Sequence, residues 1–238
     1  MLETLDVPYA GAGVLASAVC MDKVLFKDLM RSAGVPQVDY LAAVEGGELD
    51  ALEALGLPVF VKPARLGSSV GISKVTSNEE LPGALAIAWE HDPVALVEAM
   101  SYGMEVECSV LGNAGPEASL PGEIVIKADW YDQEAKYEAG AMELVVPARL
   151  SEQVQGRVRA MALEAFARVG CAGMARCDFF VEEDGGVLLN ELNTIPGFTQ
   201  TSVYAKLFEA SGVPYPELLD RLVARALERF ALERSYRG

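Results

Sequence analysis

The sequence predicts an α+β protein whose two sheets are largely antiparallel and have helices beside them. Two β-like runs, GMARCDFFVEE and GVLLNELN, flank the turn signal Asp184-Gly185-Gly186 and therefore predict a hairpin. The segment MEVECSVLG alternates polar and apolar residues, as a half-buried strand does. The apolar run LPVFVKPA and the later VGISKV are typical of a buried strand and its return. Strands in this order, with helices beside them, indicate the α+β class.

The other elements follow from periodicity and end signals. Helices are expected at residues 21–33, 48–55, 77–91, 151–169, 201–211 and 214–231. The first ends at Gly34, a normal residue after a helix, and the third begins with a capping box formed by Ser77 and Glu80. Further strands are expected at residues 38–43, 95–100, 104–112 and 117–126. Residues 1–20 contain no strand or helix that we expect to build a core.

The composition excludes several classes of protein. A chain of 238 residues, 51% hydrophobic, can form one large domain or two small lobes with a real core. The net charge of −16 argues against non-specific binding to nucleic acid, and no stretch is long and apolar enough to span a membrane. A single histidine, His91, argues against a Ser-His-Asp triad and a multi-His zinc site. The cysteines lack CxxC spacing and predict reduced thiols in a cytoplasmic protein; they are Cys20, Cys108, Cys171 and Cys177.

The predicted hairpin carries polar side chains that can share one face. We assume the register in which Glu182 pairs with Val187. In that register two polar pairs face each other, Asp178 with Glu191 and Arg176 with Asn193. Two carboxylates and an amide oxygen are hard ligands suited to Mg²⁺. The guanidinium beside them suits a phosphate or a developing oxyanion.

Basic groups and a small loop elsewhere suit a polyanion. Lys62, at the end of a strand, is either solvated or aimed into a cleft. The glycine- and serine-rich residues 65–71 have backbone N–H groups that can cradle phosphates, although such turns are common and no Walker A loop is present. Lys23 lies at the start of a predicted helix, where a positive charge opposes the helix dipole. It therefore either has a ligand-binding role or is an ordinary surface lysine. Glu98 is a carboxylate in an apolar strand, which favours a ligand contact. Together these groups predict an ATP·Mg site.

Three further segments have both a functional and an ordinary interpretation. Glu105 and Glu107 contact a ligand or are the solvated face of an edge strand. Residues 127–142 form a long polar loop that predicts a lid, in which Lys136-Tyr137 is either functional or a plain loop pair. Residues 193–199 suit a rigid substrate-binding loop or an ordinary turn before a helix.

Taken in order, these motifs resemble the D-alanine–D-alanine ligase family of the ATP-grasp superfamily. The matching segments are MDK (21–23), VFVKPARLGSSVGISKV (59–75), LVEAMSYGMEVECSVLG (96–112), GEIV (122–125), EAKY (134–137), VPA (146–148), GCAGMARCDFF (170–180) and NELNTIPGFTQTSVY (190–204). The resemblance implies two α+β lobes, residues 21–101 and 102–238, that grasp ATP between two sheets. Residues 1–20 are expected to be the remnant of an N-terminal domain that holds the first D-alanine.

The resemblance also implies a role for each matched residue. The cofactors are expected to be ATP and two Mg²⁺ ions, for which Mn²⁺ is an alternative. The expected ATP-binding residues are Lys23 and Lys62 at the phosphates, Ser68 and Ser69 in the loop over them, Glu98, Ala99 and Met100 at adenine, Glu105 at ribose, and Lys136. The expected Mg²⁺ ligands are Asp178, Glu191 and Asn193. The expected catalytic residues are Arg176 and Gly197 at the tetrahedral intermediate, Ser68, Ser202 and Lys136 at the substrates, and Tyr137 in the lid.

The activity implied is ATP-dependent joining of two D-alanines through a D-alanyl phosphate, for peptidoglycan precursors. Self-association, for example as a homodimer, is expected through the apolar residues of segment 1–20. Without the N-terminal domain we expect synthesis by this chain to be impaired. The alternatives are another ATP-grasp carboxylate–amine ligase, or an inactive nucleotide-binding remnant.

Overall fold

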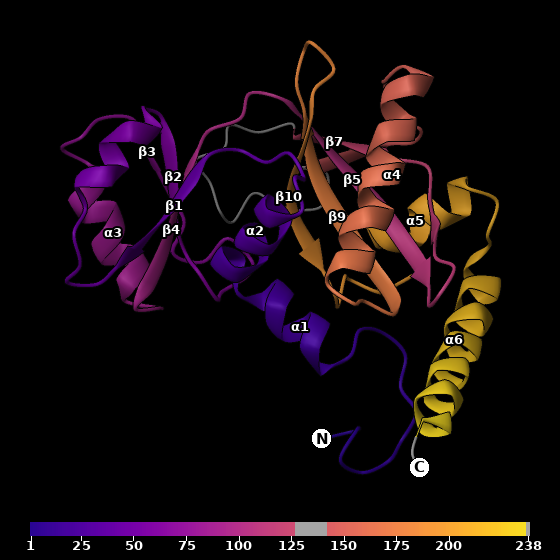
Figure 1. Cartoon of the computed structure of the whole chain (residues 1–238). Helices are drawn as coiled ribbons and strands as arrows, with labels where there is room; N and C mark the ends of the chain where they lie inside the picture. The colour runs from indigo at the N-terminus through magenta and orange to yellow at the C-terminus, as the bar shows by residue number, and fades with distance from the viewer. Residues whose placement is uncertain (127–141, 237–238) are drawn as a thin grey trace.

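Two antiparallel sheets with helices on their faces make up the framework of the computed structural model, which describes residues 1–126 and 142–236 (Figure 1). The smaller sheet has the strand order β1-β4-β2-β3. Its strands are β1 (Tyr40–Val44), β2 (Val59–Pro63), β3 (Ser73–Val75) and β4 (Val94–Ala99). Helix α3 (Leu81–Trp89) packs on the sheet, and the short 3-10 helix η1 (Asp50–Leu55) contributes Leu52 to the same core.

The larger sheet has the strand order β10-β9-β5-β7-β8, with β6 beside β5. Its strands are β5 (Met104–Gly112), β6 (Glu117–Ala118), β7 (Gly122–Ile126), β8 (Met142–Val145), β9 (Gly173–Val181) and β10 (Val187–Asn193). Every described strand pair in both sheets is antiparallel, which confirms the predicted fold class.

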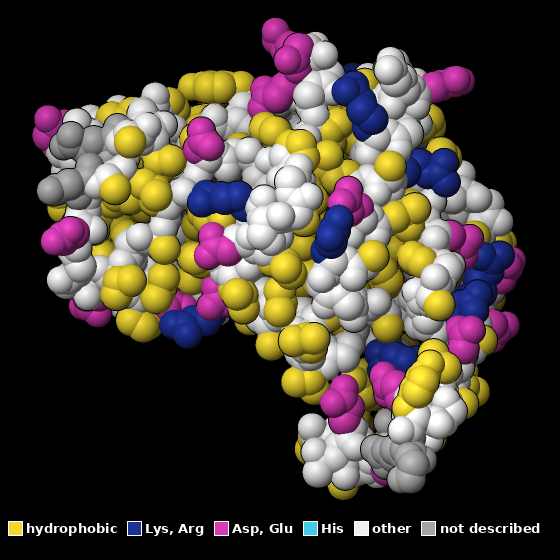
Figure 2. Space-filling model, in the orientation of Figure 1, with side chains coloured by type: hydrophobic (Ala, Val, Ile, Leu, Met, Phe, Trp, Pro, Cys, Tyr) yellow, Lys and Arg dark blue, Asp and Glu magenta, His cyan; other side chains and the backbone are white. Residues whose placement is uncertain are grey.

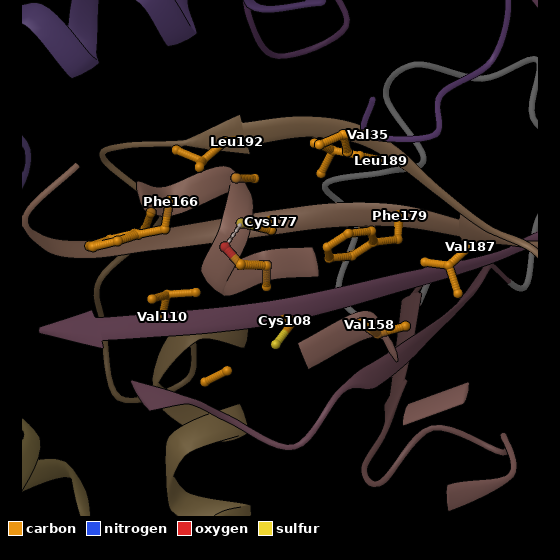
Figure 3. Packing of buried hydrophobic residues seen from close by; sticks show 14 of the residues in the cluster. Val35, Cys108, Val110, Val158, Phe166, Cys177, Phe179, Val187, Leu189 and Leu192 are labelled. Atoms are coloured by element: carbon orange, nitrogen blue, oxygen red, sulfur yellow. Dashed lines mark hydrogen bonds between the residues drawn. The ribbon is translucent and has the colours of Figure 1, made fainter. Parts of the chain in front are cut away.

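Helix α4 (Glu152–Arg168) covers one face of the larger sheet and closes its main core. Because side chains alternate along a strand, Cys108 of β5 and Cys177 and Phe179 of β9 all point to this side, where Figure 3 shows them packed with Phe166 of α4. On the opposite face, α5 (Val203–Ala210) and α6 (Tyr215–Ser235) cover one end of the sheet, at Leu111. The rest of that face carries the polar side chains described below.

Helix α2 (Lys23–Ser32) joins the two sheets. Its apolar side chains Phe26 and Met30 belong to the core of the larger sheet. Its first residue, Lys23, donates its backbone N–H to the carbonyl oxygen of Ala64, directly after β2, over 3.0 Å. The helix therefore holds its N-terminal turn against the smaller sheet while its body packs on the larger one.

The sequence-based elements need several corrections. Residues 1–20 do form a helix, α1 (Val14–Met21), but only Ala16 in it is buried. The helix predicted from residue 21 begins at Lys23, because Asp22 is its N-cap residue. Asp22 has an extended backbone, and its carboxylate accepts hydrogen bonds from the N–H groups of Val24 and Leu25. No side-chain cap from Ser77 is present at α3.

The remaining corrections concern short elements. Segment 48–55 contains a 3-10 helix rather than an α-helix. The strand predicted over residues 117–126 is divided at Pro121 into β6 and β7. Strand β8, only four residues long, was not predicted.

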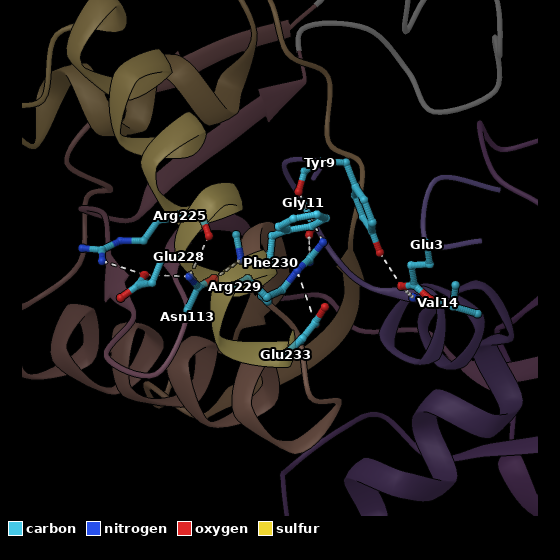
Figure 4. A network of polar contacts seen from close by, with 12 residues as sticks. Glu3, Tyr9, Gly11, Val14, Asn113, Arg225, Glu228, Arg229, Phe230 and Glu233 are labelled. Carbon is cyan, nitrogen blue, oxygen red and sulfur yellow. Dashed lines mark hydrogen bonds and ion pairs between the residues drawn. The ribbon is translucent and has the colours of Figure 1, made fainter. Parts of the chain in front are cut away.

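The N-terminal segment is fastened to α6, as Figure 4 shows. Arg229 donates hydrogen bonds to the carbonyl oxygens of Tyr9 and Gly11, and its guanidinium carbon lies 4.3 Å from the centre of the Tyr9 ring. Arg234 pairs with Asp6. We call these contacts the clasp; they border a cavity of about 120 Å³.

The state of the cysteines and the hydropathy of the helices complete the description of the fold. All four cysteines are free thiols, as their spacing predicts. Among the described residues, no helix combines the length and apolar character that crossing a lipid bilayer requires.

Candidate functional site

The β9–β10 hairpin brings its polar residues together through a β-bulge. Val187 pairs with Val181 and not with Glu182, so the assumed register is wrong at the turn. A bulge at Asn190 then shifts the register by one residue, and beyond it the polar residues pair as expected, Asp178 with Glu191 and Arg176 with Asn193. Without the bulge, Glu191 would lie opposite Cys177 and face the core.

These four side chains form a connected polar network on the face opposite α4. Arg176 donates two hydrogen bonds to Asp178, from Nε to Oδ1 over 2.7 Å and from Nη2 to Oδ2 over 2.8 Å. Asn193 Nδ2 donates to Asp178 Oδ2 over 2.9 Å and to Glu191 Oε1 over 3.2 Å. The guanidinium and the two carboxylates are therefore fixed relative to one another.

Strand β5 adds a carboxylate, that of Glu107, whose role the sequence analysis left undecided. Glu107 lies directly opposite Asp178, and its Oε2 is 3.0 Å from Nε of Arg176. Because β5 is an interior strand between β9 and β7, the interpretation of Glu107 as part of a solvated edge is wrong. Burial and the nearby Asp178 carboxylate raise the pKa of Glu107 to about 8.

The chemistry of this carboxylate row fits a divalent cation. Burial raises the pKa of Asp178 to about 6, although Arg176 opposes the shift. The carboxylates of Glu107, Asp178 and Glu191 thus crowd one guanidinium in a partly buried row, and a cation would relieve their repulsion. Among the described residues no three His, Cys, Asp or Glu side chains already converge as metal ligands. Asp178 is engaged by Arg176 in this structure. Carboxylate and amide oxygens are nevertheless the donors that Mg²⁺ prefers.

Lysines from α2 and β2 converge on one carboxylate of the smaller sheet. Glu98 of β4 is 5% exposed and pairs with Lys62, which extends from the neighbouring strand β2. Its second oxygen lies 3.3 Å from Nζ of Lys27 on α2. Burial alone would raise the pKa of Glu98, but the Lys62 and Lys27 ammonium groups outweigh it and hold this pKa at about 2.

The lysine cluster and the carboxylate row act on each other electrostatically. Burial lowers the pKa of Lys23, and Glu191 is the carboxylate that most strongly opposes this shift. Lys23 Nζ also donates to the carbonyl oxygen of Leu66, at the start of the glycine- and serine-rich loop. The site thus has a cationic side on α2, β2 and β4 and an anionic side on β5, β9 and β10.

Lys27 was not among the sequence candidates. The signal that could have found it is its place on α2, four residues after Lys23 and therefore on the same side of the helix. It stands between the core residues Phe26 and Met30, where a lysine is unexpected.

The other candidate residues lie around these two sides. Ser68 and Ser69 both have left-handed backbone conformations, with φ of 57° and 58°. The backbone N–H groups of Ala99 and Met100 are used in hydrogen bonds to the carbonyl oxygens of Asp39 and Pro58, respectively, so their carbonyl groups are the parts a ligand could use.

Glu105 and the 197–202 loop complete the set. Glu105 lines an open pocket of about 440 Å³ with Tyr102 and Val125. Ser202 Oγ accepts the backbone N–H of Thr199 over 2.9 Å, which closes the turn at residues 199–202, and Gly197 lies beside the same hydroxyl. Lys136, Tyr137 and all but the last residue of the proposed lid, 127–142, lie outside the described residues.

Comparison with known proteins supplies a family. The family model described as the D-Ala D-Ala ligase C-terminus matches residues 29–224. A D-alanine–D-alanine ligase from a Thermoanaerobacter species is 50% identical over 237 residues, which cover 96% of this chain and 66% of the relative. The chain therefore spans slightly less than two thirds of that relative's length.

Two solved structures have the same fold. The D-alanine–D-alanine ligase from Coxiella burnetii is 40% identical with a TM-score of 0.89, and the match covers 98% of this chain and 64% of that one. The enzyme from Bacillus anthracis, solved in complex with ATP, is 29% identical with a TM-score of 0.85, over 98% of this chain and 74% of that one.

Proposed function

The chain belongs to the D-alanine–D-alanine ligase family and has the ATP-grasp fold, and from this premise we propose that it binds Mg·ATP between its two sheets and uses it to join two D-alanines. The proposed reaction transfers the γ-phosphoryl group of ATP to the carboxylate of one D-alanine. The amine of the second D-alanine then attacks the acyl phosphate, and phosphate leaves. The products are the dipeptide, ADP and phosphate.

The observation that carries the proposal is the opposition of two charged sides in a strongly acidic protein. Lys23, Lys27 and Lys62 gather on the side formed by α2 and the smaller sheet, although the chain as a whole has a net charge of −16. A polyanion needs such a local excess of positive charge. Mg²⁺, when bound, would supply charge neutralisation at the phosphates, and the donors that fit it are Asp178, Glu191 and Asn193.

The residues of this chain contribute positioning and charge rather than a nucleophile. Arg176 is held on two sides, by Asp178 and by Glu107. Within the proposal, this fixed guanidinium stabilises the negative charge that would develop on the acyl phosphate and on the tetrahedral intermediate. The finer assignments remain part of the proposal: Ser68 and Ser69 over the phosphates, Glu105 at ribose, and Ser202 and Gly197 at the second D-alanine. The same holds for Lys136 and Tyr137, and for two metal ions rather than one.

The proposal is tested by measuring ADP release by the chain with and without D-alanine, alongside Arg176→Met. Release that requires Mg²⁺, rises with D-alanine and is lost in the Arg176 variant is the expected result. D-serine or L-alanine in place of D-alanine serves as the substrate control. Binding of Mg·ATP without any effect of D-alanine on ADP release would contradict the ligase proposal and leave nucleotide binding alone.

A further inference from the structure

Lys27 is a buried lysine with only one carboxylate close to its ammonium group among the described residues. Its side chain is 1% exposed and lies among apolar residues of α2 that belong to the core. Among the described residues, Glu98 is the sole carboxylate within ion-pair distance, and its Oε2 is 3.3 Å from the lysine Nζ. The ring of Tyr40 is the other neighbour of the ammonium group, with its centre 5.3 Å from Nζ.

The charges around Glu98 do not balance. The single carboxylate in contact is already paired with Lys62, so the buried trio has one net positive charge, and Glu191 acts on Lys27 only from a distance. Burial lowers the pKa of Lys27, which reflects the free-energy cost of keeping this charge out of water. A methionine of similar length would fill the space beside Phe26 and Met30 without that cost. Stability of the fold alone therefore gives no reason for a lysine here.

The surplus positive charge can be explained by its effect on Lys62, the other partner of Glu98. Because the Lys27 ammonium group lies 3.3 Å from Oε2 of Glu98, without a hydrogen bond to it, Glu98 shares its charge between two lysines and neutralises Lys62 only in part. Lys62, which is 8% exposed, then keeps positive charge and N–H donors for another anion. Without Lys27 both oxygens of Glu98 would be free to hold Lys62, and the attraction of the site for phosphate would weaken.

We propose that Lys27 is a positioning residue for the nucleotide phosphates, which acts through Glu98 by keeping Lys62 incompletely neutralised. This inference rests on the proposed function. Lys27 itself does not contact the nucleotide, because Glu98 and the body of α2 enclose it. Its effect is electrostatic, so it depends on the number of phosphates in the ligand and is smallest for a ligand that has none.

The test compares Lys27→Met with the unaltered chain by calorimetric titration with Mg·ATP, AMP and adenosine. Affinity for Mg·ATP is expected to fall about tenfold, affinity for AMP less, and affinity for adenosine least, since adenosine has no phosphate and meets Glu98 only at the adenine. The melting temperature, measured without nucleotide, is expected to stay the same or rise, since a surplus buried charge has been removed. Weaker binding combined with undiminished stability is a result that a purely structural role cannot produce.

Two further variants separate charge from packing. Lys206→Met removes the same charge from an exposed position on α5, and its affinity for Mg·ATP is expected to stay within about twofold of the unaltered chain. Lys27→Arg keeps the charge, and its affinity for Mg·ATP is expected to stay within about threefold. The arginine variant also covers the case in which Lys27→Met does not fold.

The outcomes distinguish this inference from the function on which it rests. An unaltered chain that fails to bind Mg·ATP overturns the proposed function, and this inference with it. An unaltered chain that binds Mg·ATP, with Lys27→Met binding it equally well, overturns the role of Lys27 alone. That role is also overturned if Lys27→Met loses adenosine and Mg·ATP affinity in equal measure, or if Lys27→Arg loses as much affinity as Lys27→Met.

Discussion

At the scale of single residues, the carboxylate of Glu98 stabilises the two buried lysines on the cationic side of the site. It is the partner of two buried ammonium groups, those of Lys62 and Lys27, and it lies between strands β1 and β2 of the smaller sheet. Removing its charge leaves both lysines buried without an ion pair. That is far more costly than removing one of the lysines.

Glu98→Gln is therefore expected to lower the free energy of unfolding by about 3–5 kcal/mol at pH 7. The native pKa of Glu98 is about 2, below its ordinary value of 4.5, so its contribution is complete above pH 4.5 and is lost as the pH falls toward 2. Urea unfolding at several pH values should show the two proteins differing most near pH 7 and converging between pH 4.5 and 2. Glu45→Gln, an exposed carboxyl beside the same sheet, is the control. A constant difference across this pH range would contradict the assignment.

The carboxylates of the hairpin give a second prediction at this scale. Glu191→Gln keeps the shape of the side chain but removes one charged donor from the row that fits Mg²⁺. Binding of Mn²⁺, followed by its electron paramagnetic resonance signal in the presence of ATP, is expected to weaken about 10–100-fold. Glu183→Gln removes the same charge from the exposed tip of the hairpin and should bind Mn²⁺ normally. Equal affinities in the two variants would place the cation elsewhere.

At the scale of elements, the bulge at Asn190 is the feature that the hairpin requires. Leu189 pairs with Phe179 in the core, and Glu191 pairs with Asp178 on the polar face. Because these partners are adjacent in β9, one residue of β10 must be left over. Asn190 is that residue, and the bulge lets both faces keep their proper side chains.

Deleting Asn190 should thus remove the bulge but preserve the pairing on both sides of it. We expect this variant to fold with a loss of less than about 2 kcal/mol, which reflects the changed local twist. Deleting Leu189 gives a chain of the same length and register, but it places the amide of Asn190 at the core position, so it should lose about 3 kcal/mol or more. Thermal unfolding of the two deletion variants tests this order. Comparable losses would show that the bulge has another purpose.

The hairpin also illustrates how much of the structure can be predicted from the sequence. Alternation and the Asp-Gly-Gly turn predict both strands and the face shared by Asp178 and Glu191, but no local signal marks the bulge. The prediction of the pairs was right although its assumed starting register was wrong. Alternation could not identify β5 as an interior strand, because a polar face looks the same in solvent and in a buried site. Glu107 was left open for that reason.

Short elements were missed because their stability comes from tertiary contacts. Strand β8 has four residues and owes its existence to pairing with β7. Helix α1 has eight residues with a single buried position, so it has almost no periodic signal. The lysine cluster shows the same limit. The sequence predicted that Lys23, Lys62 and Glu98 belong together. The place of Lys27 one helical turn after Lys23 is visible in it, but not that Lys27 shares the carboxylate, which depends on how α2 packs beside β4.

At the scale of the whole molecule, the clasp ties the beginning of the described chain to its last helix. Figure 1 shows the N-terminal segment beside the last turns of α6, and Arg229 and Arg234 make the connecting contacts. Figure 2 shows hydrophobic side chains over α1, where Val14 and Leu15 are 62% and 72% exposed. The clasp therefore holds an apolar helix in a fixed place on the surface. Self-association through this segment stays a prediction.

Arg229→Met should release the N-terminal segment. The side chain is 11% exposed and donates to two backbone carbonyl groups, so its loss is expected to cost about 1–3 kcal/mol. Amide exchange of residues 5–14 should accelerate, while exchange in β9 and β10 changes little. Arg225→Met, which breaks only an exposed ion pair one turn earlier on α6, should alter neither quantity. Unchanged protection of residues 5–14 in Arg229→Met would show that the clasp is not what holds them.

The distribution of cysteines gives the larger sheet a built-in reporter of its own opening. Cys108, Cys171 and Cys177 are buried in the core beneath α4, Cys20 packs against it, and the smaller sheet has none. Burial raises the pKa of all four thiols, so the reactive thiolate is scarce in the closed state. A thiol-specific reagent then modifies the three buried cysteines only when this core opens, so their modification over time follows local unfolding of one half of the molecule, whereas the half-buried Cys20 can react without it. A ligand held between the sheets would lower the rate of thiol modification, so its binding can be detected without any added label.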